Sequence, residues 1–148
     1  MRDLPRQLSV DELAELFEGR TRFVERLAQL EDPLGRAREI AATLSDDEKK
    51  EVLDAHPAIG ATKEGLSVRS AAEQGSDDTD PSILGELEQL NNRYEEKFGF
   101  RFVVFVDRRS RAELVPVLRQ RLGRTREEEL ATGVSELIAI AKDRWLSR

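Results

Sequence analysis

The clearest helical signal in this chain lies in the stretch Thr125-Arg-Glu-Glu-Glu-Leu-Ala-Thr-Gly-Val-Ser-Glu-Leu-Ile138. The Thr125 hydroxyl can accept a free amide of the first helical turn, and the Glu128 carboxylate can reach back to the Thr125 amide, which together make a capping box. Apolar residues then recur at helical spacing, at Leu130, Val134, Leu137, Ile138 and Trp145. The stretch therefore predicts a long amphipathic helix that continues nearly to residue 148.

The same start signal occurs three more times ahead of apolar periodic runs. In each case a serine is followed three positions later by a glutamate: Ser9 and Glu12, Ser45 and Glu48, Ser110 and Glu113. Asp80-Pro81 predicts another helix start, because proline is favoured at the first helical position. That helix is predicted to end at Phe98, before Gly99, and the one after Ser110 to end at Gly123. Residues 21–30 and 33–44 also have helical spacing.

One short run breaks the helical pattern. Phe100-Arg-Phe-Val-Val-Phe-Val106 is rich in β-branched and aromatic residues, which favours a strand or another extended conformation. The sequence contains no second run of this kind that could pair with it in a sheet. We therefore predict an all-α fold, a single-domain bundle of seven to nine helices over residues 1–148, because this length is close to the usual size of one domain.

Composition and charge exclude several functional classes. The net charge is -6, and an acidic surface repels phosphate backbones, so we expect no nucleic-acid partner. The chain has no cysteine, which excludes disulfides, a cysteine nucleophile and thiolate metal sites. No apolar run approaches the length of a membrane span, and residues 1–12 are unlike a signal peptide, so we expect no membrane association and a cytoplasmic location.

The least regular part of the chain, residues 55–80, contains its only histidine, His56. A long irregular region inside a compact domain is either functional or disordered. Imidazole has an unperturbed pKa of about 6.5, which suits proton transfer near neutral pH. Pro57 disfavours α geometry in the residue before it, so we expect His56 at the end of the preceding helix. The ordinary alternative, a surface or packing histidine, is the commoner role for this residue type.

A second candidate group lies in Ser70-Ala-Ala-Glu-Gln74. If this segment is helical, Ser70, Glu73 and Gln74 share one face and offer a hydroxyl, a carboxylate and an amide to one small polar ligand. The ordinary alternative here is a solvated helix face. The acidic run over residues 76–80 lacks the spacing of a calcium loop, and one histidine without cysteine argues against zinc, so we expect no metal site.

Three ordered segments together resemble the OHCU decarboxylase family, whose substrate is 2-oxo-4-hydroxy-4-carboxy-5-ureidoimidazoline. They are His56-Pro-Ala-Ile-Gly60, Ser70-Ala-Ala-Glu-Gln74 and Leu90-Asn-Asn-Arg-Tyr-Glu-Glu-Lys-Phe-Gly-Phe-Arg-Phe-Val103. The family's C-terminal pattern is matched by Arg121-Leu122, Glu129-Leu130 and Ile140-Ala-Lys-Asp-Arg144. The chain departs from the common family pattern at Ala58, Ile59 and Arg101, and the last of these places a charge near the expected substrate segment.

The resemblance implies an all-α homodimer that uses no metal or organic cofactor and forms (S)-allantoin and carbon dioxide during urate breakdown. It implies that His56 is the catalytic acid and that Glu73 works beside it. It also implies a substrate-binding set made of Pro57, Ser70, Gln74, Phe102, Val103, Val104, Phe105, Val106 and Arg144. The segment 102–106 would bind largely through its backbone groups, and Arg144 is expected to partner a carboxylate or a helix end.

The chemistry of such a substrate explains why no cofactor is expected. Loss of carbon dioxide leaves an electron pair on carbon, and an adjacent imine-like bond of the substrate ring can receive it. The protein must then supply orientation, a dry site and a proton. We expect His56 to supply the proton near neutral pH, with Glu73 raising its pKa. Two alternatives stay open: a helical interaction module without catalysis, and a family member acting on a related ureido or imidazole carboxylate.

Overall fold

The computed structural model describes residues 4, 5, 7–57 and 81–147. Within these ranges the chain contains no strand and forms seven α-helices: α1 (Val10–Phe17), α2 (Arg22–Leu27), α3 (Pro33–Ala41), α4 (Asp46–Asp54), α6 (Pro81–Phe98), α7 (Arg111–Leu122) and α8 (Arg126–Leu146). The predicted all-α fold is confirmed. None of the helices in the described ranges combines the length and the apolar character that a membrane crossing requires.

The predicted capping boxes begin three of these helices. The hydroxyls of Ser9, Ser45 and Thr125 accept the amide three residues ahead, and the glutamate there accepts the cap amide, with all six bonds between 3.0 and 3.2 Å. The box predicted at Ser110 forms only in part. Its hydroxyl accepts the Glu113 amide, but the Glu113 carboxylate bonds the same hydroxyl instead of the backbone. Short-range hydrogen bonds therefore set where these helices begin.

Gly99 and Gly123 directly follow α6 and α7, as predicted, although the two glycines have different backbone conformations. Gly99 follows α6 with a φ of 81°, in the left-handed region that favours glycine. Gly123 follows α7 with a φ of -84°, which any residue can adopt. The helical patterns over 21–30 and 33–44 correspond to the shorter helices α2 and α3. Between them Asp32 caps α3, since its carboxylate accepts the Gly35 amide at 3.3 Å.

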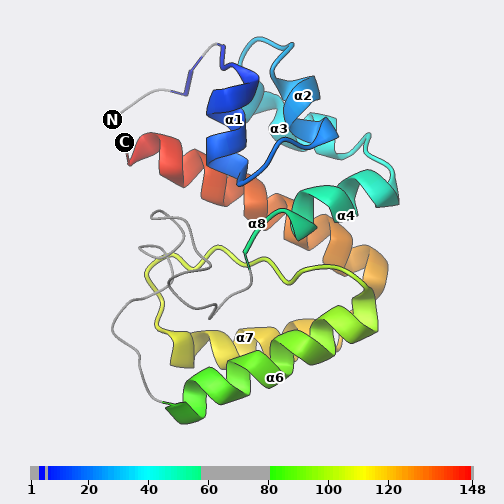
Figure 1. Ribbon diagram of the computed structural model, residues 1–148, viewed down its shortest axis with the longest axis vertical. Coiled ribbons are helices and arrows are strands. Elements are labelled where there is room, and N and C mark those ends of the chain that lie inside the picture. Colours follow the sequence, from blue (N-terminus) through cyan, green and yellow to red (C-terminus); the bar gives the residue numbers. More distant parts are fainter. Residues whose placement is uncertain (1–3, 6, 58–80, 148) are drawn as a thin grey trace.

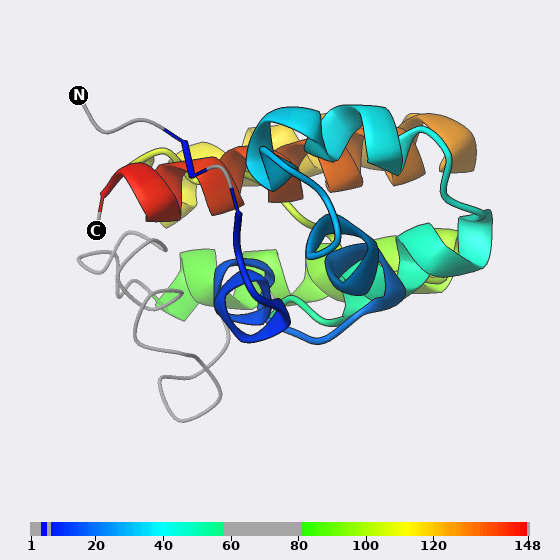
Figure 2. The same ribbon diagram turned by 90° about the horizontal axis from the view of Figure 1, so that it is seen from above.

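The helices form two groups on either side of an extended segment, residues 100–106 (Figure 1). In the first group α1, α3 and α4 pack against α8, and α2 packs against α1, α3 and α4. In the second group α6 and α7 lie side by side. The view from above shows α3 running along α8 (Figure 2). The long C-terminal helix thus supports α1, α3 and α4 directly and α2 through them.

The extended segment lies in the apolar interior between the two groups. Its residues Phe100, Phe102, Val103, Val104 and Val106 are buried. Tyr94 of α6 contacts this segment through its ring, whose centroid lies 5.2 Å from that of Phe102 and 5.9 Å from that of Phe100. The prediction of an extended run without a sheet partner is confirmed for the described residues. Side-chain packing on both faces replaces the sheet pairing that the sequence composition would otherwise favour.

A glycine allows α4 and α8 to approach each other closely. A Cβ atom added at Gly133 of α8 would lie 2.9 Å from Cδ2 of Leu53, near the end of α4, and Leu53 is fully buried. Because a packed core side chain has little room to move, this contact fixes the distance between the two helices. It therefore also fixes the position of the residues that follow α4 directly.

Replacement of Gly133 by alanine is expected to destabilise the protein by roughly 1–3 kcal/mol, because the added methyl group overpacks the contact with Leu53. The matched control is Gly85→Ala in α6, where an added Cβ meets nothing within 4 Å. That change is expected to stabilise the protein by up to about 1 kcal/mol, since alanine has the higher helix propensity. Urea unfolding of both variants measures the difference. Equal effects of the two substitutions would contradict the proposed close contact.

Candidate active site around His56

His56 lies directly after α4, as its place before a proline predicts. Its amide donates to the Leu53 carbonyl at 3.1 Å, which continues the last turn of the helix, and Pro57 follows it. The His56 side chain is only 8% exposed. Its Nδ1 atom is buried and has no hydrogen-bond partner within the described part of the chain. An unpaired buried imidazole nitrogen is costly, and such a group is common where a ligand or a proton is to be bound.

Burial and two arginines lower the pKa of His56 to about 4. Burial is the largest cause, because it disfavours the charged imidazolium. The positive charges of Arg144 and Arg101 act in the same direction, while the negative charge of Glu18 opposes them. The described surroundings therefore hold His56 in its neutral form at pH 7. This differs from the expectation of a proton donor with a pKa near neutrality, because the burial of the imidazole, which is the largest cause of the lowered pKa, does not follow from the local sequence pattern.

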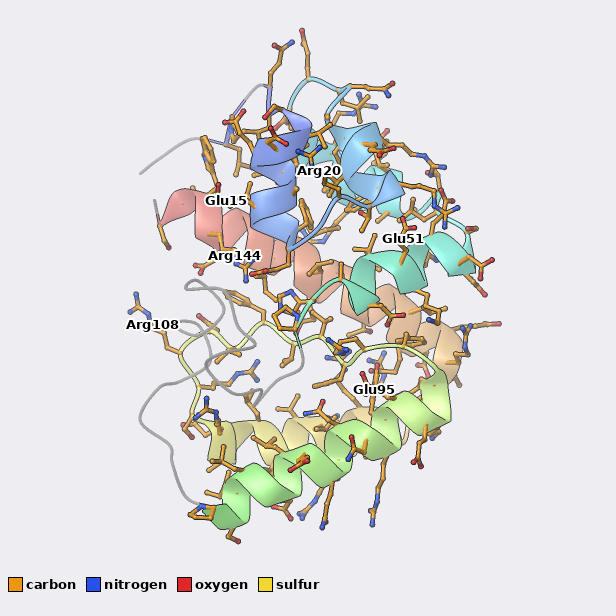
Figure 3. The ribbon with its side chains drawn as sticks, in the orientation of Figure 1. Glu15, Arg20, Glu51, Glu95, Arg108 and Arg144 are labelled. Atoms are coloured by element: carbon orange, nitrogen blue, oxygen red, sulfur yellow. The ribbon has the colours of Figure 1, made fainter. Side chains whose placement is uncertain are left out.

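Arg144 connects the C-terminal helix α8 to the end of α1. Its Nη1 donates to the Leu16 carbonyl at 2.8 Å, and its Nη2 lies 3.2 Å from a carboxylate oxygen of Glu18. Only 3% of Arg144 is exposed. Figure 3 shows this side chain on α8 beside the lower end of α1. Both kinds of partner expected for Arg144 are therefore present, a helix end and a carboxylate, and both come from within the protein.

Arg101, where the chain departs from the family pattern, connects three parts of the structure. Its backbone amide donates to the Asp54 carboxylate at 2.9 Å, and its Nε donates to Glu95 of α6 at 2.8 Å. Figure 3 shows Glu95 projecting from α6 toward the extended segment. The Nη1 atom of Arg101 donates to the His56 carbonyl at 2.5 Å. The charge at this position is thus paired with a glutamate and helps to hold the backbone of His56.

The extended segment 102–106 has some of its backbone groups bound by the protein. Arg121 donates to the Val103 carbonyl at 2.6 Å, and Arg109 donates to the carbonyls of Phe105 and Val106 at 2.6 and 3.0 Å. The Phe105 amide donates to Glu136 of α8 at 3.4 Å, a long bond. The carbonyls of Val103, Phe105 and Val106 are therefore bound by arginine side chains of the protein itself.

A buried charge network connects this segment to α7 and α8. The Glu129 carboxylate of α8 accepts from Arg121 Nε at 2.7 Å and from the Tyr94 hydroxyl at 2.6 Å. The second carboxylate oxygen accepts from Arg124 at 3.0 Å. Glu129 is fully buried, and the Arg121 guanidinium also lies 4.4 Å from the Phe102 ring centroid. Buried charges require such pairing, so the network fixes Arg121 and, through it, the Val103 carbonyl.

A tight turn with unusual backbone geometry follows the segment. Asp107 and Arg108 have φ values of 49° and 63°, both in the left-handed region that non-glycine residues rarely adopt. The Arg109 amide closes the turn on the Val106 carbonyl at 2.9 Å. This reversal brings the Arg109 side chain back onto the carbonyls of Phe105 and Val106, while Arg108 is exposed and extends outward (Figure 3).

The structure thus brings together some of the predicted site residues. Arg144 is close enough for its charge to act on His56, as is Arg101, which was not among the predicted site residues, and Pro57 follows His56 in the chain. Ser70, Glu73 and Gln74 lie outside the described residues, so their position beside His56 stays a prediction. In the described ranges, no group of three or more His, Asp or Glu side chains is suited to hold a metal ion.

Sequence analysis missed the roles of Glu18, Arg121 and Glu129. Glu18 follows a short helix and belongs to no motif, so nothing in its sequence context indicates a contact with α8. The only signal for Arg121 and Glu129 is that both fall within the C-terminal family pattern, which assigns them no function. Each of them has a contact that local spacing does not indicate: Glu18 with Arg144, Arg121 with the Val103 carbonyl, and Glu129 with Tyr94.

Comparisons with known proteins agree with this arrangement. The family model described as OHCU decarboxylase matches residues 2–146. The chain is 28% identical over 149 aligned positions to 2-oxo-4-hydroxy-4-carboxy-5-ureidoimidazoline decarboxylase of Haloferax volcanii, with 94% of this chain and 88% of the relative covered. It is also 28% identical to the protein of the same name in Halalkalicoccus jeotgali, covering 89% of this chain and 80% of that one.

Solved structures share the fold. The crystal structure of an OHCU decarboxylase in the presence of (S)-allantoin aligns with a TM-score of 0.75 at 24% sequence identity, covering 90% of this chain and 94% of the other. The crystal structure of an (S)-allantoin synthase aligns with a TM-score of 0.69 at 23% identity, covering 93% of this chain and 48% of that protein. The predicted fold of this family is therefore confirmed for the chain.

Proposed function

The chain belongs to the OHCU decarboxylase family, and from this premise we propose that it converts 2-oxo-4-hydroxy-4-carboxy-5-ureidoimidazoline to (S)-allantoin and carbon dioxide in urate breakdown. Two relatives that bear the name of this activity align over most of both chains. The observation in the structure that carries the proposal is the buried imidazole of His56, whose Nδ1 has no hydrogen-bond partner among the described residues and which lies in the field of two arginines. A neutral acid–base group in a cationic environment suits an anionic carboxylate substrate.

The proposed reaction cleaves one carbon–carbon bond and uses one proton. The carboxylate leaves as carbon dioxide, the electron pair of the broken bond passes into the imine-like bond of the ring, and a proton completes the product. The substrate thus acts as its own electron sink, which is why the proposal includes no metal or organic cofactor. The tasks left to the protein are orientation, exclusion of water and delivery of the proton to one face.

The low pKa of His56 favours proton delivery at the right moment. A carboxylate bound beside the ring adds a negative charge, which raises the pKa of His56 and promotes uptake of a proton from solvent. When carbon dioxide leaves, the electron pair of the broken bond stays on the ring, so the bound intermediate keeps the negative charge. The imidazolium, which Arg144 and Arg101 make more acidic, then donates its proton to that intermediate and completes the product. His56 returns to its neutral form for the next turnover.

The remaining predicted residues have supporting roles in this proposal. Glu73 orients the imidazole or the ureido group, and Ser70 and Gln74 bind polar atoms of the substrate. Pro57 shapes the site next to His56. The segment Phe102–Val106 binds the substrate largely through its backbone groups. Arg144 acts on the carboxylate mainly through its charge, because its guanidinium is already held by Leu16 and Glu18.

We further propose that residues 1–148 form one domain, that the enzyme is a homodimer and that it works in the cytoplasm. The family resemblance implies the dimer, and the match of a single family model to residues 2–146 supports the single domain.

A coupled assay tests the proposed activity. Urate oxidase and the following hydrolase generate the unstable substrate in the cuvette, and circular dichroism records the formation of optically active allantoin. Addition of this protein is expected to produce a rapid signal of the S enantiomer, whereas the spontaneous reaction gives slow formation of racemate. Prior dialysis against a metal chelator is expected to leave the rate unchanged. Product that forms at the spontaneous rate and without optical activity would rule out the proposed function.

A further inference from the structure

The end of α1 has an unusual residue in a left-handed conformation. Glu18 caps this helix with a φ of 65° and a ψ of 22°. Glycine is the usual residue there, because a side chain adds a cost of roughly 1–2 kcal/mol. A glycine is present one position later, at Gly19, yet the left-handed position is occupied by a glutamate. Such geometry is typical of a residue whose side chain has a specific task.

The backbone next to Glu18 packs directly on the residue that precedes His56. A Cβ atom added at Gly19 would lie 3.0 Å from the Cβ of Ala55, which is closer than most real contacts of this kind. Gly19 therefore allows the loop after α1 to approach the end of α4. This contact places Glu18 and His56 on two chain segments that touch each other, although 37 sequence positions separate Gly19 from His56.

The Glu18 carboxylate forms an ion pair with Arg144 of α8. Its oxygen lies 3.2 Å from Arg144 Nη2, and the side chains of Arg144 and Glu18 are 1% and 16% exposed. A guanidinium so deeply buried requires a counter-charge, because desolvation of an unpaired cation is costly. The bond from Arg144 to the Leu16 carbonyl fixes the same guanidinium from a second side. The end of α1 thus determines where the charge of Arg144 lies.

The charges that act on His56 come from three elements. Arg144 acts from α8, Arg101 from the residue that follows Phe100, and Glu18 from the end of α1. Arg101 is itself paired with Glu95 and bonded through its amide to Asp54. Among the described groups whose charge affects the His56 pKa, Glu18 is the one anion, and it alone raises that pKa.

We propose that Glu18 is a positioning residue of the His56 site, which holds Arg144 in place beside the imidazole and offsets part of its positive charge. The catalytic part of this inference rests on the proposed function, because Glu18 would act on His56 as the proposed catalytic acid. Without the carboxylate of Glu18, the charge of Arg144 would act on His56 undiminished. The imidazole would then hold a proton less readily, both in the free protein and with a carboxylate bound.

The single histidine of the chain makes a direct test possible. In protein labelled with ¹³C-histidine, the only imidazole Cε1–Hε1 signal belongs to His56, and its chemical shift is followed as the pH is lowered from 8. Glu18→Gln preserves the size of the side chain and removes its charge. The control is Glu25→Gln, an exposed residue of α2 that makes the same change in net charge. Far-UV circular dichroism of each sample identifies the pH range in which the protein stays folded.

The expected result is a titration midpoint at lower pH in Glu18→Gln than in the wild type, with Glu25→Gln unchanged. In the coupled assay Glu18→Gln is also expected to lower kcat roughly threefold to tenfold at pH 8, as a loss of up to one pKa unit implies, with a smaller change in KM. A wild-type midpoint and a wild-type pH profile of kcat in Glu18→Gln would overturn the inference. If no sample decarboxylates the substrate but the midpoint still falls, the proposed function fails while the placement of Glu18 stands.

Discussion

Replacement of His56 by asparagine is expected to lower kcat by a factor of roughly 10²–10⁴, the usual contribution of a positioned general acid. Asparagine keeps a polar side chain of similar size at the end of α4 but cannot transfer a proton at neutral pH. Stereospecificity should be lost as well, because the remaining product would receive its proton from solvent on either face. The coupled assay measures both effects, as the rate and as the optical activity of the allantoin.

Protein stability distinguishes a loss of catalysis from a loss of folding in this variant. The pKa of His56 is lowered from 6.5 to about 4 in the folded protein. Above pH 6.5 His56 is neutral whether the chain is folded or unfolded, so its low pKa does not change the free energy of unfolding there. As the pH falls from 6.5 to 4, His56 becomes protonated in the unfolded chain but stays neutral in the folded protein. The free energy of unfolding therefore decreases by up to about 3 kcal/mol.

His56→Asn lacks this proton linkage, so its free energy of unfolding should decrease less than that of the wild type between pH 7.5 and pH 5. Urea unfolding at the two pH values measures the difference, and other titrating groups cancel in the comparison. Wild-type activity in His56→Asn would contradict the catalytic assignment. Equal pH dependence of stability in both proteins would show that the ring is not held neutral by burial and the neighbouring arginines.

The helices could be predicted because their signals lie within a few residues of one another. A cap at Thr125 and a glutamate three positions later mark the start of α8, and the same local chemistry marks the starts of α1 and α4. The His56-Pro57 pair likewise predicted correctly that the histidine follows a helix. Each of these predictions depends only on the conformations of residues that are neighbours in the sequence.

The electrostatic surroundings of His56 could not be predicted in this way. Arg144 reaches the Leu16 carbonyl across 128 sequence positions, and no spacing rule connects the end of α1 with the end of α8. The buried position of His56 also decides between two ordinary interpretations of a lone histidine. It excludes a surface residue, and the unpaired Nδ1 within the described residues differs from a packing histidine whose hydrogen bonds are satisfied.

Removal of the charge of Glu129 is expected to be among the most destabilising single changes in this protein. Glu129→Gln leaves Arg121 buried with no counter-charge and weakens the bonds to Tyr94 and Arg124. Breaking one side of a buried ion pair typically costs roughly 3–5 kcal/mol. Glu86→Gln provides a matched control, because Glu86 of α6 pairs with Arg119, which lies on α7 as Arg121 does. This second pair is at the surface, with the Glu86 side chain 40% exposed and the Arg119 side chain 59% exposed. The control should lose less than about 1 kcal/mol.

A double replacement separates stability from positioning. Arg121→Met combined with Glu129→Leu removes both buried charges, and apolar substitutes of similar volume commonly restore most of the stability lost by the single change. The Val103 carbonyl nevertheless loses its hydrogen-bond donor, so Arg121 no longer holds the extended segment in place. We therefore expect urea unfolding to show recovered stability in the double variant while its KM for the substrate stays raised. Full recovery of KM together with stability would mean that Arg121 and Glu129 support the fold alone, without placing the segment 102–106 for substrate binding.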